Sequence, residues 1–125
     1  MVGKETILTS CDNSGIIYTR CINLSSALNL NEVKLASVIR TMPKILDYSK
    51  PLRKKPYLSL VLSLKKIIRR PQGVWLRFNK NRVLNLNDAY KFLGTRVKGP
   101  ICREIRSSSN KVRYRKIIHY SRITI

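Results

Sequence analysis

Residues 57–79, "YLSLVLSLKKIIRRPQGVWLRFN", contain the clearest strand pattern in the sequence. Leucine fills every second position of the first half (Leu58, Leu60, Leu62, Leu64), with Ser59, Val61, Ser63 and Lys65 between them. Because successive side chains of a strand point to opposite faces, this alternation predicts a strand with one apolar face. A Pro-Gln-Gly turn follows, and apolar residues then alternate again at Val74, Leu76 and Phe78. The whole stretch therefore predicts a β-hairpin.

The same pattern extends outward to other short strands. "TILTSCDNSG" (6–15) predicts a strand ending in a turn, and "IIYTRCINL" (16–24) predicts its return. "KLASVIRTM" (34–42) predicts a strand that Pro43 ends, and "NRVLNLN" (81–87) adds another. Residues 43–56, with three prolines and a basic cluster, predict a mobile loop that could reach RNA. Five or six short strands in about ninety residues are typical of a mainly β protein that forms a small closed or nearly closed antiparallel barrel.

The alternating strand pattern ends after residue 87. "PICREIR" (100–106) is compatible with a short helix that has Pro100 at its first position. "NKVRYRKIIHYSRITI" (110–125) fits a short helix and a short strand equally well. We expect residues 1–125 to form a single domain, with a barrel core at about 5–87 and a C-terminal segment at about 88–125.

Charge is the most informative property of the composition. The 26 Lys and Arg outnumber the 6 Asp and Glu, so the net charge is +20. Residues 1–43 carry a net +1, whereas residues 44–125 carry 22 bases against Asp47, Asp88 and Glu104, a net +19. Such self-repulsion predicts a polyanionic partner. Nucleic acid, which releases condensed counterions on binding, is favoured over anionic lipid.

The cations fall in clusters along the second half of the chain. Arginine binds phosphate through its planar fork and lysine as a point charge. The residues predicted to bind RNA are Lys65, Lys66, Arg69, Arg70, Arg77, Lys80, Arg82, Arg96, Lys98, Arg103, Arg106, Arg113 and Arg115. Trp75, Tyr114 and Tyr120 could stack on unpaired bases or cover the core. Phosphates between the cations would explain why a hairpin turn tolerates so many like charges.

The sequence gives little support to other chemistries. His119 is the only histidine and the acids are scattered, which argues against an enzyme and against a small-molecule substrate. Cys11, Cys21 and Cys102 show neither a disulfide framework nor zinc-ligand spacing, so we predict buried or half-buried free thiols in a reducing compartment and no metal or cofactor. No run approaches the ~20 apolar residues of a membrane span, and we expect no membrane insertion and no targeting segment.

Three motifs together resemble a known family. They are "DNSG" (12–15) followed by Cys21-Ile22, "KK-x-x-RRP-x-G-x-x-x-RF-x-x-N" across 65–81, and "GTR-x-x-GP-x-x-RE-x-R" across 94–106. In order and spacing they are similar to the universal large-subunit ribosomal protein of the L-fourteen family, over nearly the whole chain.

The resemblance implies a five-stranded barrel with a long hairpin and a C-terminal segment with one or two short helices. It implies binding to large-subunit rRNA, contact with neighbouring large-subunit proteins, and a bridge to small-subunit rRNA at the face between subunits. Asn13, Ser14 and Gly15 match the family's first turn, and Gly94 and Gly99 match its C-terminal motif. For Glu104 we expect an ion pair with Arg103 or Arg106, the alternative being contact with a partner protein.

Several positions depart from the family pattern. Ser63-Leu64 replaces a common Arg-Thr, Lys98 replaces an apolar aromatic residue, and residues 23–38 lack the usual Gly-rich stretch. With the Ile-, Lys-, Asn- and Tyr-rich usage, these departures suggest an organelle-encoded copy in the mitochondrial matrix, with plastid or bacterial cytoplasm as alternatives. The competing function is a free barrel-type nucleic-acid-binding module or RNA chaperone outside the ribosome.

Overall fold

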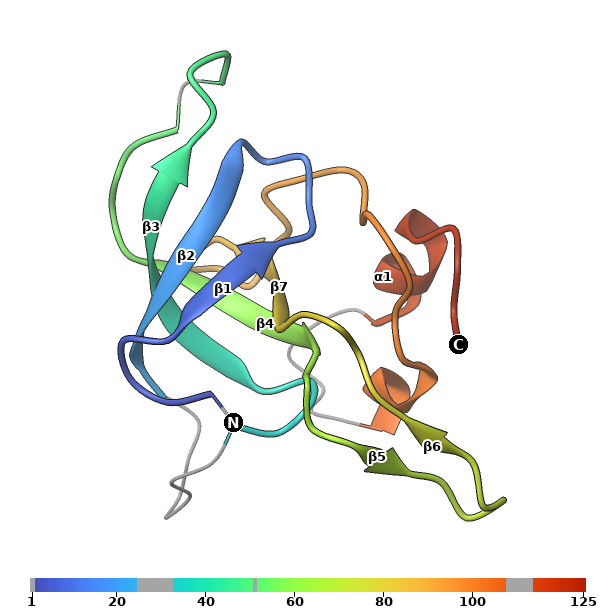
Figure 1. Cartoon of the computed structure of the whole chain (residues 1–125). Helices are drawn as coiled ribbons and strands as arrows, with labels where there is room; N and C mark the ends of the chain where they lie inside the picture. The colour runs from blue at the N-terminus through green and yellow to red at the C-terminus, as the bar shows by residue number, and fades with distance from the viewer. Residues whose placement is uncertain (1, 25–32, 51, 108–113) are drawn as a thin grey trace.

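The computed structural model describes residues 2–24, 33–50, 52–107 and 114–125 (Figure 1). Five strands close into a barrel in the order β1-β2-β3-β4-β7, which confirms the predicted fold class. Their bounds are Ile7–Ser10 (β1), Ile16–Asn23 (β2), Val38–Leu46 (β3), Tyr57–Ser63 (β4) and Arg82–Leu86 (β7). Four of the pairs are antiparallel, and the pair that closes the barrel, β1 with β7, is parallel, with Thr9 opposite Arg82.

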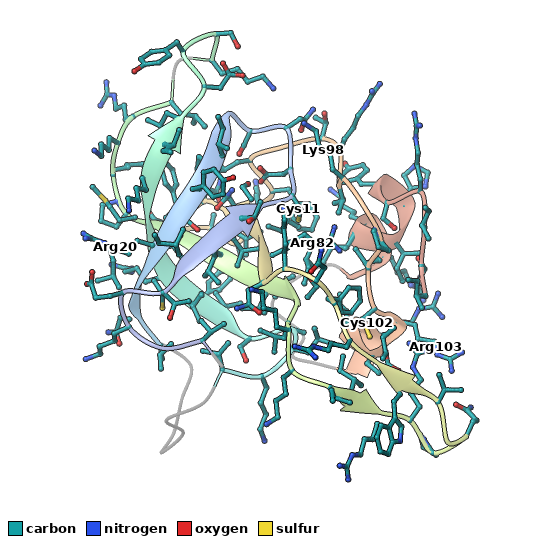
Figure 2. The ribbon with its side chains drawn as sticks, in the orientation of Figure 1. Cys11, Arg20, Arg82, Lys98, Cys102 and Arg103 are labelled. Atoms are coloured by element: carbon teal, nitrogen blue, oxygen red, sulfur yellow. The ribbon has the colours of Figure 1, made fainter. Side chains whose placement is uncertain are left out.

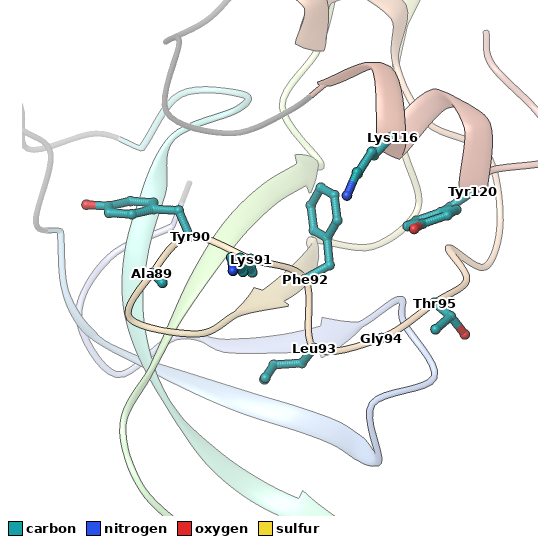
Figure 3. Close-up of a pocket in the computed structure, with 9 residues that line it drawn as sticks. All are labelled: Ala89, Tyr90, Lys91, Phe92, Leu93, Gly94, Thr95, Lys116 and Tyr120. Carbon is teal, nitrogen blue, oxygen red and sulfur yellow. The ribbon is translucent and has the colours of Figure 1, made fainter.

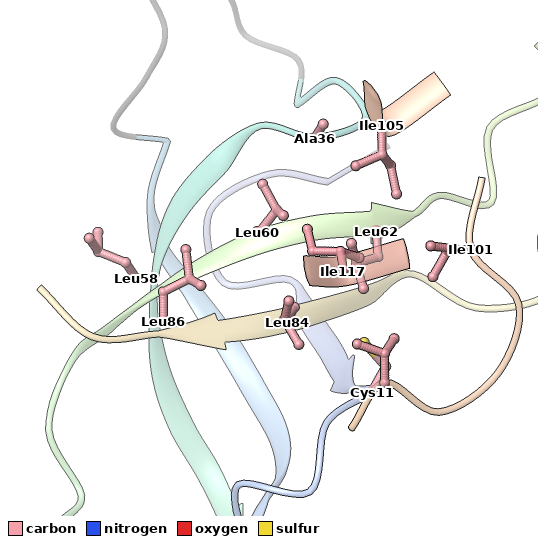
Figure 4. Close-up of a cluster of buried hydrophobic side chains, with 11 residues drawn as sticks. Cys11, Ala36, Leu58, Leu60, Leu62, Leu84, Leu86, Ile101, Ile105 and Ile117 are labelled. Carbon is pink, nitrogen blue, oxygen red and sulfur yellow. The ribbon is translucent and has the colours of Figure 1, made fainter. Parts of the chain in front are cut away.

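The leucine alternation of β4 lines the outside of the barrel rather than its interior. Leu58, Leu60 and Leu62 pack with Leu84 and Leu86 of β7 on the outer wall. The C-terminal segment covers this wall, so both faces of β4 are buried (Figure 4). Because the C-terminal segment covers the outer face of β4, the leucines can face outward and still be buried. The serines, which alternate with them, then face the barrel interior.

The barrel interior has an apolar layer and a polar layer. The apolar layer takes one residue from each barrel strand, namely Leu8, Cys21, Ile39, Val61 and Val83. In the polar layer, the Thr41 and Ser59 hydroxyls lie 2.7 Å apart, and Ser59 Oγ donates to Asn85 Oδ1 at 3.0 Å. These hydrogen bonds satisfy polar groups that would otherwise destabilise the core.

Asp12 completes the polar layer. Its carboxylate is buried and accepts hydrogen bonds from the Asn85 backbone N–H at 3.0 Å and from the hydroxyls of Ser10 and Ser14 at 2.7 and 2.6 Å. The Asn85 side-chain amide also donates to Ser10 Oγ at 2.6 Å. The residue predicted only to make a turn thus also ties β1 to β7.

Pro43 does not end its strand, contrary to the sequence prediction. β3 continues to Leu46, and Pro43 lies opposite Thr19 of β2 beside a register shift. β4 pairs with β3 only at residues 38–41, so beyond Thr41 one side of β3 is an edge, where a proline without an N–H is tolerated. The predicted loop 43–56 therefore begins as strand.

The C-terminal segment forms a 3-10 helix, Arg103–Ser107 (η1), and an α-helix, Tyr114–Tyr120 (α1). The helix predicted to start at Pro100 begins instead at Arg103, and the ambiguous tail is helical over α1. Ile101, Ile105 and Ile117 are buried against the β4–β7 wall (Figure 4). Each fully buried isoleucine contributes about 1.5–3 kcal/mol, which holds the segment on the barrel.

All three cysteines are buried free thiols, as predicted. Burial raises the pKa of the Cys11 thiol to about 12 and, less strongly, that of Cys21. Their thiolates are therefore scarce at neutral pH, which matches a packing role. Among the described residues, no helix is long and apolar enough to cross a membrane.

Replacement of Asp12 tests the polar layer. Asp12→Ala leaves the buried Asn85 N–H without its acceptor, and we expect the free energy of unfolding to fall by about 2–3 kcal/mol. Urea unfolding followed by circular dichroism measures this change. Asp88→Ala, at an exposed position with the same change in charge, should change stability by less than about 0.5 kcal/mol. Equal losses in both variants would contradict the role of the network.

Candidate nucleic-acid interface

A two-stranded hairpin projects from the barrel between β4 and β7 (Figure 1). Its strands are short, Ile68–Arg69 (β5) and Trp75–Leu76 (β6), and Gly73 turns the chain with a φ of 82°. The Arg70 N–H donates to the Val74 carbonyl at 3.0 Å, and the Gly73 N–H donates to the Arg70 carbonyl at 3.1 Å. The exposed cations of this region are Lys65, Lys66, Arg69, Arg77 and Lys80.

Arg70 joins the hairpin to the C-terminal segment. Its Nε and one terminal nitrogen donate to the two Glu104 carboxylate oxygens at 2.5 and 3.0 Å, a bidentate ion pair. The same terminal nitrogen donates to the Ile125 carbonyl at 2.7 Å. Glu104 therefore forms an ion pair as predicted, but its partner is Arg70 rather than Arg103 or Arg106.

The electrostatics of this contact follow from its geometry. The hydrogen bond from Arg70 holds the pKa of Glu104 at about 2, below its ordinary 4.5, and the pKa of Arg70 is raised by the same bond. The buried Cys102 thiol also donates to Glu104. Burial first, and then this hydrogen bond, raise the pKa of Cys102. The carboxylate is thus kept ionised by two donors.

Arg82, another predicted RNA-binding residue, also bonds within the chain. Its Nε donates to Ser63 Oγ at 3.0 Å, and its terminal nitrogens donate to the carbonyls of Lys98 at 3.2 Å and of Pro100. Gly99, with a φ of 80°, lies against this guanidinium, where a side chain would collide with it. Arg82 fastens the loop 96–100 to β7.

The first turn and the C-terminal motif, predicted separately, meet in space. Asn13 Oδ1 accepts the backbone N–H groups of Thr95 and Arg96 at 2.7 and 3.2 Å, and Asn13 Nδ2 donates to Thr95 Oγ1 at 2.9 Å. Gly94 fits because a Cβ there would lie 2.6 Å from Asn13 Oδ1. Asn13 therefore fixes the backbone that carries Arg96.

The other two turn residues have different roles. Gly15, with a φ of 100°, accepts the Asp47 N–H at 2.7 Å and so connects the first turn to the end of β3. The Ser14 hydroxyl donates to Asp12 as described above. The predicted turn is therefore a junction between the barrel, the loop after β3 and the C-terminal motif.

The remaining predicted cations of the C-terminal segment reach the surface. Figure 2 shows Lys98 and Arg103 on the side of the C-terminal segment, away from Arg20 on the opposite side of the barrel. Arg103 also approaches the hairpin, where one of its terminal nitrogens lies 3.5 Å from Gln72 Oε1. The exposed members are Arg96, Lys98, Arg103, Arg106 and Arg115, whereas Arg113 lies outside the described residues.

Two shallow grooves flank the same motif. One, of about 590 Å³, lies between residues 89–95 and α1, with Lys91 and Lys116 among its lining residues (Figure 3). The Phe92 and Tyr120 rings meet there edge to face, with centroids 6.0 Å apart. The other, of about 600 Å³, is lined by Arg96, Lys98 and Arg122 among others. Tyr120, predicted either to stack on bases or to cover the core, borders both grooves and packs partly against the core.

The long-range contacts are what sequence reasoning missed. Arg70 and Glu104 are 34 positions apart, and Asn13 and Thr95 are 82 apart. The only sequence signal was that each lies in one of the three motifs described above. In the described part of the chain, no group of three or more His, Cys, Asp or Glu could hold a metal ion.

The Arg70–Glu104 pair generates a pH prediction. Because the folded pKa of Glu104, about 2, lies below its ordinary 4.5, the pair stabilises the protein above pH 4.5, and this stabilisation is lost as pH falls toward 2. Glu104→Gln should lower the free energy of unfolding by about 1–2 kcal/mol at neutral pH, and the difference from the parent should vanish near pH 2. Urea unfolding across this pH range measures it.

Glu5→Gln is the matched control for that prediction. Glu5 pairs with Arg20 at 3.2 Å, but its side chain is 71% exposed, so solvent screens the pair and the variant should differ little from the parent. A constant difference between Glu104→Gln and the parent over the whole pH range would argue against the ion pair.

Comparison with known proteins agrees with this arrangement of motifs. The family model described as ribosomal protein L14p/L23e matches residues 1–125. The large ribosomal subunit protein uL14 of Carsonella ruddii (strain PV) is 29% identical over 108 residues, which cover 86% of this chain and 88% of the relative. The chain therefore belongs to the L14p/L23e family of ribosomal proteins, which are structural components of the ribosome rather than enzymes.

Proposed function

We propose that this chain is a structural constituent of the large ribosomal subunit and binds rRNA through its hairpin and C-terminal segment. The observation that carries the proposal is the exposure of cations on both elements. Residues 44–125 contain only three acids, Asp47, Asp88 and Glu104, against 22 bases, and Glu104 is already engaged by Arg70. Most cations of this half therefore have no acid within the fold to neutralise them, and phosphates supply the missing charge.

The phosphate-binding residues we propose are those at the surface. They are Lys65, Lys66, Arg69, Arg77, Lys80, Arg96, Lys98, Arg103, Arg106 and Arg115, with Arg113 as a prediction from sequence alone. Arg70 and Arg82 are left out because their guanidinium groups bond to acceptors within the chain. These two residues position the surface instead of contacting RNA.

The mechanism is electrostatic and depends on a rigid scaffold. Each cation placed near a phosphate releases condensed counterions, which drives association. The barrel keeps the hairpin and residues 94–106 at fixed separation through Arg70 and Asn13. Because few backbone angles must be ordered on binding, little conformational entropy is lost.

Other features of the family remain proposals for this chain. Contacts with neighbouring large-subunit proteins, and a bridge to small-subunit rRNA, follow from the family resemblance. Glu104 is a weaker candidate for a protein contact than the sequence suggested, because Arg70 and Cys102 already bind its carboxylate. A mitochondrial location rests on residue usage and on the departures from the family pattern, and the relative described above is bacterial.

Sedimentation separates this proposal from a free RNA-binding module or chaperone. An epitope-tagged chain should migrate with large subunits through a sucrose gradient and stay with them in high salt. Recovery only in the light fractions, with no large-subunit rRNA, would support the free module instead.

The salt dependence of binding tests the assigned surface. Arg77→Gln with Lys80→Gln should reduce the slope of log affinity against log salt by about 0.7–0.9 for each phosphate that the variant no longer neutralises. Filter binding to purified large-subunit rRNA at several salt concentrations gives this slope. Lys4→Gln with Arg40→Gln removes the same charge from exposed positions in the weakly charged first part of the chain and should change the slope less. Equal changes would argue against a localised interface.

A further inference from the structure

Trp75 is an exposed tryptophan whose position the core does not explain. It is the only tryptophan in the chain, and the residue is 65% exposed on β6 of the hairpin. Indole is a large apolar ring, and leaving it in water is unfavourable unless a partner covers it. Its location on the most basic projecting element points to a partner that combines negative charge with a flat surface.

The geometry around Trp75 leaves part of the ring available. Arg69 is its cross-strand neighbour, and the Arg69 guanidinium carbon lies 4.9 Å from the ring centroid. This cation–π contact orients the indole and keeps a positive charge beside it. The residue is still 65% exposed, so a second flat group can reach it.

The hairpin holds this ring in a fixed place. The β5–β6 turn is closed by the hydrogen bonds of Arg70 with Val74 and Gly73, and the Arg70 side chain is bonded to Glu104. The platform therefore does not need to be ordered on binding. Residues 65–81 contain no acidic residue, so nothing in the hairpin sequence repels a phosphate next to the ring.

We propose that Trp75 is a stacking platform for an unpaired nucleobase of RNA, with Arg69 beside the ring and Arg77 available for the flanking phosphates. This inference rests on the proposed rRNA binding and deepens it, because it specifies an unpaired nucleotide. Bases inside an A-form helix are stacked on one another and cannot reach a side chain, whereas a looped-out base can. Base–aromatic stacking is sequence-tolerant, which suits a structural contact.

The single tryptophan makes the test direct. Fluorescence of the full-length protein, excited at a wavelength that tyrosine does not absorb, reports on Trp75 alone, and a short oligoadenylate should quench it on binding. An RNA duplex with the same number of phosphates should bind through charge but quench much less. Vesicles of phosphatidylserine and phosphatidylcholine test whether Trp75 binds a lipid surface instead of RNA.

Three variants separate stacking from charge. Because the Trp75 variants contain no tryptophan, filter binding measures the affinities of all variants. Trp75→Leu should weaken binding of oligoadenylate about tenfold and should leave duplex affinity unchanged. Trp75→Phe keeps an aromatic ring and should retain most of the affinity. Tyr18→Leu, a partly exposed aromatic on β2 of the barrel, is the matched control and should have no effect.

The outcomes are distinct. Equal losses on duplex and oligoadenylate, or no quenching by oligoadenylate, would overturn the platform while leaving electrostatic RNA binding intact. A blue shift with vesicles and none of the RNA effects would favour a lipid surface. Failure of the unsubstituted protein to bind either RNA would overturn the proposed function itself.

Discussion

The scarcity of carboxylates is the constraint on which the rest of this structure depends. With 6 acids against 26 bases, charge pairing cannot neutralise the surface. Three of the acids instead make contacts that hold the fold together. Asp12 links β1 to β7 from inside the barrel, Glu104 receives Arg70, and Asp47 caps its own turn by accepting the Ser49 N–H. Arg82 is held without an acid, because it donates to the Ser63 hydroxyl and to two backbone carbonyls.

This use of acids explains why the cations divide into two groups. The Arg70 guanidinium connects the hairpin to the C-terminal segment through Glu104, and the Arg82 guanidinium connects β7 to the loop 96–100 through the Lys98 carbonyl. No strand pairing joins these segments. Lysine is a poor replacement for either, because its compact ammonium lacks the planar fork that reaches several acceptors in a fixed geometry. The remaining cations of both elements need only be exposed. Whether a basic residue of this chain is bonded within the fold or exposed therefore depends on the acceptors that surround it, and its sequence context alone does not decide.

The strands could be predicted from sequence because alternation is a local property. Residues 57–64 identified β4, and turn residues 12–15 separated β1 from β2. Which face of β4 is interior could not be predicted, because the answer depends on residues far along the chain that cover the leucines, such as Ile105 and Ile117. The prediction for Pro43 was wrong for a related reason. A proline ends a strand only where a neighbouring strand needs its N–H, and the β3–β4 pairing ends at Thr41, before Pro43. The partner of Glu104 was likewise set by the packing of the C-terminal segment.

The motifs that carry the family resemblance are also the points where the chain contacts itself. Asn13 of the first motif accepts hydrogen bonds from the backbone N–H groups of Thr95 and Arg96 in the third, and Arg70 of the second donates to the Glu104 carboxylate in the third. Backbone amides and a bidentate pair allow little geometric freedom, so substitutions at these positions move whole segments rather than single charges. Lys98 contributes to this junction through its backbone, with its N–H 2.6 Å from the Cys11 carbonyl, and that bond does not depend on the side chain. The junction therefore does not depend on the Lys98 side chain, which is exposed and adds one more cation at the surface.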